Sequence, residues 1–127
     1  MPSDADYQRL LDFRTRLRRF DQWSRAAAEE HGLTHAQHQL LLAVRGHAGE
    51  RGPTIGEAAD YLLIRHSTLS ELVDRAGALG LVERERDEED HRVVRLRLTR
   101  QGRRVLTELT AAHLEELRRL APLLGDV

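Results

Sequence analysis

Two stretches of the sequence carry side chains that could contact the phosphates and base edges of a nucleic acid. The first is Arg65-His66-Ser67-Thr68, followed by Ser70 and Glu71, where short polar groups gather closely. The second, residues 92–104, contains six arginines and no acidic residue. Arginine presents five N–H donors in a planar fork, which suits phosphate oxygens and guanine edges. These stretches indicate a local binding surface for an anionic partner.

Other kinds of chemistry find little support. Cysteine is absent, which excludes disulfides, thiolate metal ligands and cysteine nucleophiles in this chain. The motifs of serine hydrolases, phosphate-binding loops and zinc peptidases are also absent, so we expect no enzymatic activity and no cofactor. His31, His35 and His38 lie close together, but a surface histidine cluster is favoured over a metal site. His113 is expected to be a hydrogen-bonded buried or interface histidine.

Composition limits the class of protein. The chain has 127 residues, a length that favours one domain. Its 20 basic residues, all arginine, nearly balance 21 acidic ones, so a nucleic-acid surface must be local rather than spread over the molecule. No apolar run is long enough for a membrane span, and the acidic segment Met1-Pro2-Ser3-Asp4-Ala5-Asp6 does not resemble a secretory signal. We therefore expect a soluble cytoplasmic protein.

Hydrophobic spacing predicts two helices in the first third of the chain. The first spans 7–31, with an apolar face of Leu10, Phe13, Leu17, Phe20 and Ala27, and Gly32 ends it. A capping box, Thr34-His35-Ala36-Gln37, opens the second helix, whose buried face would carry Leu40, Leu41 and Val44. Residues 46–53 are predicted to form a loop because they contain three glycines and a proline.

The remaining elements are two helices, a hairpin and a final helix. A second capping box, residues 54–57, begins a short helix, and after a break at 63–65 another helix runs from about 66 to 79. Strands at 81–86 and 93–98 flank a polar turn and predict a hairpin. Thr99 would cap a last helix, which Pro122 weakens or ends. The predicted inward face of that helix is Leu106, Leu109, His113, Leu117, Leu120 and Leu124.

This order of elements predicts a winged helix-turn-helix, a mainly α fold with a small β-hairpin. A helix fits the DNA major groove, and a thin hairpin can reach the neighbouring minor groove. The helix at about 66–79 would then contact bases, and its N-terminal amides would attract phosphate.

The chain resembles MarR-type transcriptional regulators over nearly its whole length. The resemblance rests on several short pieces in order: Gly32-Leu33-Thr34 with Gln37, residues 54–59, residues 67–75, residues 79–84, Asp87, Asp90, Arg92, and Leu98-Thr99 with Gly102. It implies a single domain with dimerisation helices at 7–31 and 100–124, around a DNA-binding part at 34–98 whose wing spans about 82–98. The implied function is a ligand-responsive repressor that binds an inverted-repeat operator as a homodimer.

The resemblance also implies roles for individual residues. Arg92 would enter the minor groove, while Asp90 would steady the wing by pairing with a nearby arginine. Four further residues are expected either to contact phosphates or to form that pair with Asp90: Arg75, Arg84, Arg86 and Arg95. A small aromatic or anionic effector would lie at Arg16, Phe20 and Trp23, although plain core packing of these residues is favoured.

Three departures from the family pattern affect these expectations. His91 stands where many relatives carry arginine, which makes one wing charge dependent on pH. Arg65-His66 stands where many have Ser-Pro, which suggests a different helix cap and base preference. The sequence also stops soon after Leu124, which suggests a dimer interface that is smaller or that relies more on residues 7–27. Because the net charge is nearly neutral and residues 87–90 are acidic, a winged-helix protein-interaction module without specific DNA binding remains the alternative.

Overall fold

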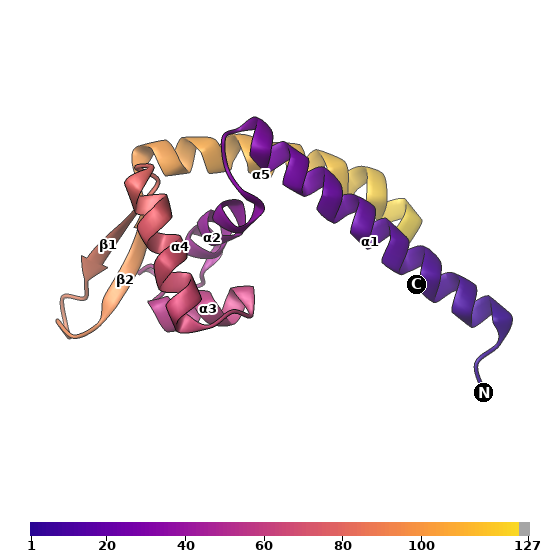
Figure 1. Ribbon diagram of the computed structural model, residues 1–127, viewed down its shortest axis with the longest axis horizontal. Coiled ribbons are helices and arrows are strands. Elements are labelled where there is room, and N and C mark those ends of the chain that lie inside the picture. Colours follow the sequence, from indigo (N-terminus) through magenta and orange to yellow (C-terminus); the bar gives the residue numbers. More distant parts are fainter. Residues whose placement is uncertain (125–127) are drawn as a thin grey trace.

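The computed structural model describes residues 1–124 and shows an extended helical arm attached to a small lobe (Figure 1). Helices α1 (Asp4–Glu30) and α5 (Arg100–Leu124) lie side by side in the arm. The lobe contains α2 (His35–Gly46), α3 (Ile55–Leu62), α4 (His66–Ala78) and the antiparallel strands β1 (Val82–Arg86) and β2 (Val94–Leu98). The predicted fold class is therefore confirmed. Within residues 1–124, none of the helices is both long and apolar enough to cross a membrane.

Side-chain caps decide where most helices begin. The predicted boxes at Thr34 and Thr54 are both present, with reciprocal bonds to Gln37 and Glu57. A third box, between Ser3 and Asp6, starts α1 three residues before the predicted position. At α5 the hydroxyl of Thr99 accepts a hydrogen bond from the backbone N–H of Gly102 at 3.0 Å, as predicted, and the helix continues past Pro122 to Leu124.

The turn between α3 and α4 is closed by a leucine in the left-handed conformation. Leu63 has φ 57° and ψ 43°, and its backbone N–H donates to the carbonyl of Asp60. A residue with a Cβ pays about 1–2 kcal/mol for this conformation. The break predicted at 63–65 is confirmed. A leucine is unusual at Leu63, because glycine normally occupies such a left-handed position.

The wing is tied to the loop that precedes α3. The backbone N–H of Leu96 donates to the carbonyl of Pro53 at 2.8 Å, and Thr54 forms an isolated bridge with Arg95. Gly52 lies so close to β2 that a Cβ there would be 1.8 Å from the Leu96 carbonyl oxygen. Only glycine fits this contact without a shift of the backbone. The loop and the base of the wing are therefore one packed unit.

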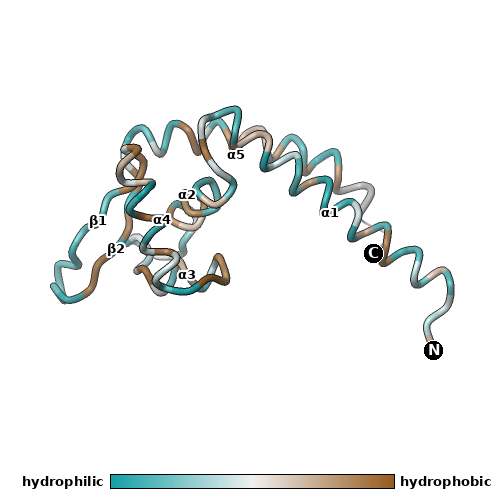
Figure 2. Tube along the Cα trace, in the orientation of Figure 1, coloured by the Kyte–Doolittle hydropathy of each residue, from teal (hydrophilic) through white to brown (hydrophobic). Residues whose placement is uncertain are grey.

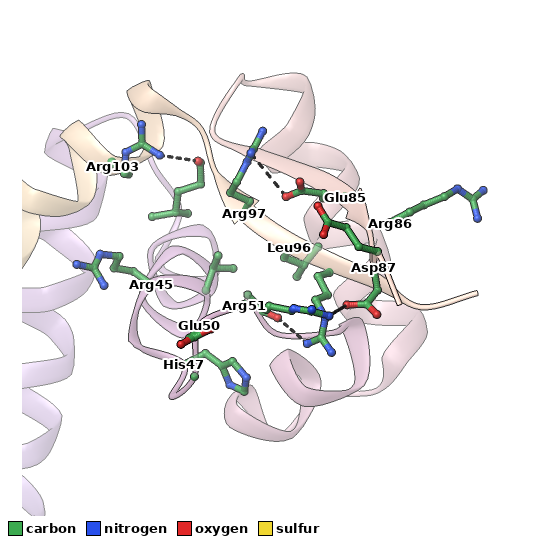
Figure 3. A pocket seen from close by; sticks show the side chains of 16 residues that line it. Arg45, His47, Glu50, Arg51, Glu85, Arg86, Asp87, Leu96, Arg97 and Arg103 are labelled. Carbon is green, nitrogen blue, oxygen red and sulfur yellow. Dashed lines mark hydrogen bonds and ion pairs between the residues drawn. The ribbon is translucent and has the colours of Figure 1, made fainter. Parts of the chain in front are cut away.

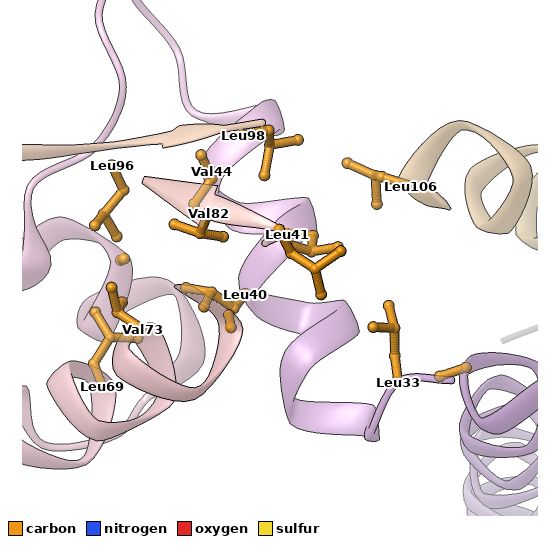
Figure 4. Close-up of a cluster of buried hydrophobic side chains, with 14 of the residues drawn as sticks. Leu33, Leu40, Leu41, Val44, Leu69, Val73, Val82, Leu96, Leu98 and Leu106 are labelled. Carbon is orange, nitrogen blue, oxygen red and sulfur yellow. The ribbon is translucent and has the colours of Figure 1, made fainter. Parts of the chain in front are cut away.

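A single cluster of apolar side chains holds the lobe together (Figure 4). Leu40 and Leu41 of α2 are fully buried, as are Leu69 of α4 and Leu96 of β2. Leu106 and Leu109 of α5 are also buried, and they join the inner end of the arm to this core. The core residues predicted for α2 are confirmed, and Leu69, Val73 and Ala76 of α4 are buried beside them.

The first half of α1 leaves part of its predicted apolar face uncovered. Leu10 and Leu17 lie on that face, and both are exposed in the single chain. Apolar residues recur along the arm beyond its contact with the lobe (Figure 2). The periodicity of this helix was correct, but no other segment of residues 1–124 covers the face that it defines.

Candidate nucleic-acid interface

The N-terminal turn of α4 presents polar side chains to solvent. Arg65 is the N-cap residue and makes no side-chain cap bond, which agrees with the unusual cap suggested by the sequence. Residues 65–68 and Glu71 are exposed, whereas Leu69 and Val73 face the core. His66 also covers the start of α3, because a Cβ on Gly56 would lie 3.2 Å from its Cε1 atom. The helix thus offers its polar face and its unpaired terminal amides on one surface.

Arg84 joins the wing to α4. Its guanidinium lies 2.8 Å from the carboxylate of Asp74 and 3.4 Å from the hydroxyl of Ser70. Arg84 thus pairs with Asp74 rather than with Asp90, the partner that one of its two expected roles required. Ser70 is half-buried beneath this contact, and it is less available than its neighbours in the first turn of the helix. Arg75 is exposed one turn further along α4.

The tip of the wing carries an arginine that projects into solvent. The Arg92 side chain is 92% exposed. Its Nε and one terminal nitrogen donate to the two carboxylate oxygens of Asp90 at 3.1 and 3.3 Å. The backbone N–H of Arg92 also donates to Asp90, and these bonds lower the pKa of that carboxyl. Asp90 therefore pairs with a nearby arginine as expected, and that arginine is Arg92 itself.

The buried carboxylate at the start of the hairpin turn is Asp87, which sequence reasoning placed only among the acids of that turn. Its side chain is 6% exposed and accepts bonds from Arg51 at 2.6 Å and from Arg95 at 2.9 Å. The backbone N–H groups of Glu89 and Asp90 donate to its other oxygen. Hydrogen bonds from Arg95, then from Arg51, lower the pKa of Asp87 to about 2 against the opposing effect of burial.

Arg95, which was expected either to contact phosphate or to pair within the chain, makes its contacts within the chain. Its guanidinium donates to Asp87 and to the carbonyl of Gly52, and only 27% of its side chain is exposed. Arg95 therefore supports the wing from inside, by pairing with Asp87 rather than with Asp90. Arg86 is exposed and donates to the carbonyl of His91 at 2.8 Å across the turn. It remains available at the surface of the hairpin.

The acidic turn is largely neutralised within the chain. Asp87 pairs with two arginines, Asp90 with Arg92, and Glu89 with Arg51 at 3.1 Å. The repulsion of phosphate expected from residues 87–90 is reduced accordingly. Sequence reasoning allowed for pairing with Arg95 but missed Arg51, because no local pattern links a residue of the glycine-rich loop to one 36 positions later.

A cavity of about 430 Å³ lies behind the wing, between the end of α2, the loop before α3 and the hairpin (Figure 3). Arg45 and Arg103 lie on one side of it, and the Arg51–Asp87 pair lies on the other. Another arginine of the lining, Arg97, is 3.6 Å from Glu85. The lining contains both arginines and acidic residues, and several of them pair with each other. The cavity therefore does not favour a ligand of either charge.

The effector residues expected on α1 take part in packing between helices. Trp23 contacts the core, and its ring lies 4.8 Å from the ring of His113. Phe20 stacks on Trp23 at 6.1 Å, and Arg16 pairs with Asp12 on the same helix. The packing interpretation favoured for these residues agrees with this arrangement.

His113 is a half-buried, hydrogen-bonded histidine at the junction of three helices. Its Nδ1 contacts the carbonyl of Leu109, and its Nε2 lies 2.6 Å from the hydroxyl of Ser24. The fully buried ring of His38 is 4.6 Å from it. Burial, followed by the nearby histidines His113, His35 and His31, lowers the pKa of His38 to about 4. Among residues 1–124, no group of metal-ligating side chains is placed to hold an ion.

A second cavity of about 430 Å³ lies directly against α4 and was not foreseen. It is bounded by the start of α2, the end of α3 and one face of α4. Its lining is mostly apolar, with polar groups at its edge. The Nδ1 atom of His35 is buried without a hydrogen-bond partner in the described chain. The residues that line the cavity are His35, Ala36, Gln39, Leu62, Ile64, Thr68, Glu71, Leu72 and Arg75.

These elements define a winged helix-turn-helix, with α3 and α4 as the helix-turn-helix and β1–β2 as the wing. The MarR family model matches residues 31–93. A MarR family protein of known structure from Bacillus stearothermophilus is 30% identical, with a TM-score of 0.76, over 91% of this chain and 77% of that one. The chain belongs to the MarR family.

Two further comparisons place the chain among its relatives. YsmB, an uncharacterised helix-turn-helix transcriptional regulator of Bacillus subtilis, is 40% identical over 65 residues, which are 51% of this chain and 44% of YsmB. MepR of S. aureus, solved in complex with DNA, shares the fold at 23% identity and a TM-score of 0.74, over 87% of this chain and 80% of that one. The chain spans about half the length of the curated relatives that it matches. Those relatives are transcriptional regulators rather than enzymes, in agreement with the prediction.

Proposed function

We propose that this protein is a ligand-responsive transcriptional repressor that binds an inverted-repeat operator as a homodimer. It would act in the cytoplasm, as one domain with dimerisation helices at 7–31 and 100–124 and a DNA-binding part at 34–98. The observation that carries the proposal is the position of the wing and of the α4 N-terminus. Both lie at the end of the lobe away from the arm (Figure 1).

The side chains of these two features suit the two grooves of a duplex. The exposed turn of α4 supplies groups for base edges and phosphates in the major groove. Arg92 at the wing tip would lie over the neighbouring minor groove, where narrow A·T-rich sequences attract arginine. Membership of a family of transcriptional regulators supports this interpretation, as does the MepR–DNA complex, which shares the fold.

The exposed apolar face of the arm supports a homodimer. A helix whose apolar residues meet no partner gains little stability from its periodicity alone. Exposed apolar stripes of this kind mark interaction surfaces. A second copy offers a face of the same chemistry. A two-fold axis would then place the α4 helix of each copy, here called the reading helix, on successive half-sites. The side chains concerned, with exposed fractions of 40–64%, are Tyr7, Leu10, Leu11, Leu17, Leu114 and Leu117.

The cavity against α4 is the best-supported place for an effector. Its apolar lining suits an aromatic ring, and Arg75 and the unpartnered Nδ1 of His35 could bind a carboxylate or phenol. A ligand there would contact both α2 and α4. It would lower DNA affinity if it favoured a spacing of the two reading helices that does not match the operator.

Selection from a random duplex library tests the proposal. The enriched duplex is then titrated by fluorescence anisotropy at several salt concentrations. We expect an inverted repeat, with half-sites about one helical turn apart and affinity that falls steeply with salt, because phosphate contacts release counterions. No enrichment, with weak binding that salt does not change, would instead support the protein-interaction module.

A further inference from the structure

Leu63 combines an unfavourable backbone conformation with almost complete exposure of an apolar side chain. Its φ is 57°, a conformation that glycine and asparagine adopt more readily than leucine. Its side chain is 89% exposed, while the flanking Leu62 and Ile64 pack against the core. Within the described chain the side chain therefore has little packing to offset the cost of this backbone conformation. A strained residue of this kind supports the hypothesis of a functional contact outside the described chain.

The position of Leu63 points to the surface that it would contact. It lies two residues before Arg65, the N-cap of α4, and so borders the turn that we place in the major groove. Arg65, His66 and the residues after them are polar, and Ile64 is half-buried. Among residues 63–68, Leu63 is thus the side chain that is both apolar and fully accessible.

We propose that Leu63 is a specificity-determining residue that packs against the C5-methyl group of a thymine at the edge of each half-site. The inference rests on the proposed function. The thymine methyl is the apolar feature of the major groove, and side chains that read it are themselves apolar at the contact. A charged phosphate would gain nothing from contact with leucine. Contact between leucine and a methyl group removes the apolar surface of both from water, which is favourable.

Deoxyuridine substitution provides the test, because it removes only the methyl group. Each thymine of the selected half-site is replaced in turn, and the Kd is measured for wild-type protein and for Leu63→Gly. At one thymine, wild-type protein should lose about fourfold in affinity, the factor expected for burial of one methyl group. Leu63→Gly should bind the thymine and deoxyuridine duplexes equally at that position. In a repeated library selection it should no longer favour thymine there.

Two controls separate this role from a general effect on folding. Leu79→Gly removes another exposed leucine at the opposite end of α4, where the backbone is ordinary, and should keep the wild-type response to deoxyuridine. Leu63→Asn should behave as Leu63→Gly does. Both Leu63 variants should melt at or above the wild-type temperature, because the substituted residues adopt the left-handed conformation more easily.

The outcomes distinguish this inference from the proposed function. In one outcome, wild-type protein binds a selected duplex in a salt-dependent way, but Leu63→Gly responds to deoxyuridine as wild-type protein does at every thymine. That result would overturn the role of Leu63 and leave the proposed function standing. A wild-type protein that selects no duplex would overturn both. If Leu63→Gly lowered the mass of the protein in solution and left base preference unchanged, the leucine would belong to a contact between copies, and the inference would also be wrong.

Discussion

The carboxylate of Asp87 accepts a 2.6 Å hydrogen bond from Arg51, which lies 36 residues earlier in the chain. This bond connects the loop before α3 to the turn of the wing. Arg95 binds the same oxygen and also the Gly52 carbonyl, so one buried carboxylate holds two segments in place. The direction of the wing therefore depends on a loop that belongs to neither the hairpin nor the reading helix.

Asp87→Asn should loosen the turn of the wing. An asparagine retains one acceptor oxygen, but it loses the charge that binds both guanidinium groups. The backbone N–H groups of Glu89 and Asp90 should then exchange with solvent faster, which NMR hydrogen exchange measures directly. Glu88→Gln, an exposed neighbour in the same turn, serves as the control. Equal protection in Asp87→Asn and wild-type protein would contradict the assignment of Asp87 as the wing anchor.

Arg92→Ala should weaken specific DNA binding by about 1–3 kcal/mol, because the lost contact lies within the recognised groove. The fold and the dimer should not change, since the side chain is 92% exposed and pairs with Asp90 of the same turn. Anisotropy against the selected duplex measures the loss. Arg118→Ala, which removes an exposed arginine of the arm, should bind as wild-type does. Wild-type affinity in Arg92→Ala would show that the wing tip does not contact the operator.

Leu17→Asp should impair association more than it impairs the fold of one chain. The side chain is partly exposed in the single chain, so a charge there costs little until a second copy covers it. Analytical ultracentrifugation should show a shift toward the 14.5 kDa monomer, and the melting temperature should fall with the loss of the dimer. Gln22→Asp adds the same charge away from the Leu10–Leu17 stripe and should remain dimeric. An unchanged mass in Leu17→Asp would refute the proposed interface.

The stability of the protein should depend on pH through His38. Burial lowers its pKa to about 4 in the folded state, whereas an unfolded histidine titrates near 6.5. Between these values the unfolded chain binds more protons, so stability is lost as pH falls from about 6.5 toward 4. Urea unfolding at about pH 7 and about pH 5 measures this loss, which should be smaller in His38→Gln. Other groups that titrate in this range contribute equally to the loss of stability in both proteins, so their contributions cancel in the comparison. Equal losses in the two proteins would contradict the lowered pKa of His38.

Local features of the sequence were sufficient to place most of the elements. The capping boxes at Thr34 and Thr54, and the alternation in β2, act over a few residues, so their patterns predict helix starts and strand faces directly. The same is true of the polar turn at 65–68, whose exposure follows from the apolar residues on the other side of α4. These local features are sufficient to predict the order of elements of a winged helix-turn-helix.

Only the tertiary structure decided which charges remain free for a partner. Arg92 and Arg95 are three residues apart and chemically identical, yet one projects into solvent and the other is held by Asp87 and Gly52. The cavity beside His35 and the uncovered face around Leu17 likewise depend on which helices meet in space. Such relationships join residues far apart in the chain. Periodicity and capping describe only near neighbours, so they could predict the elements but not the pairing between them.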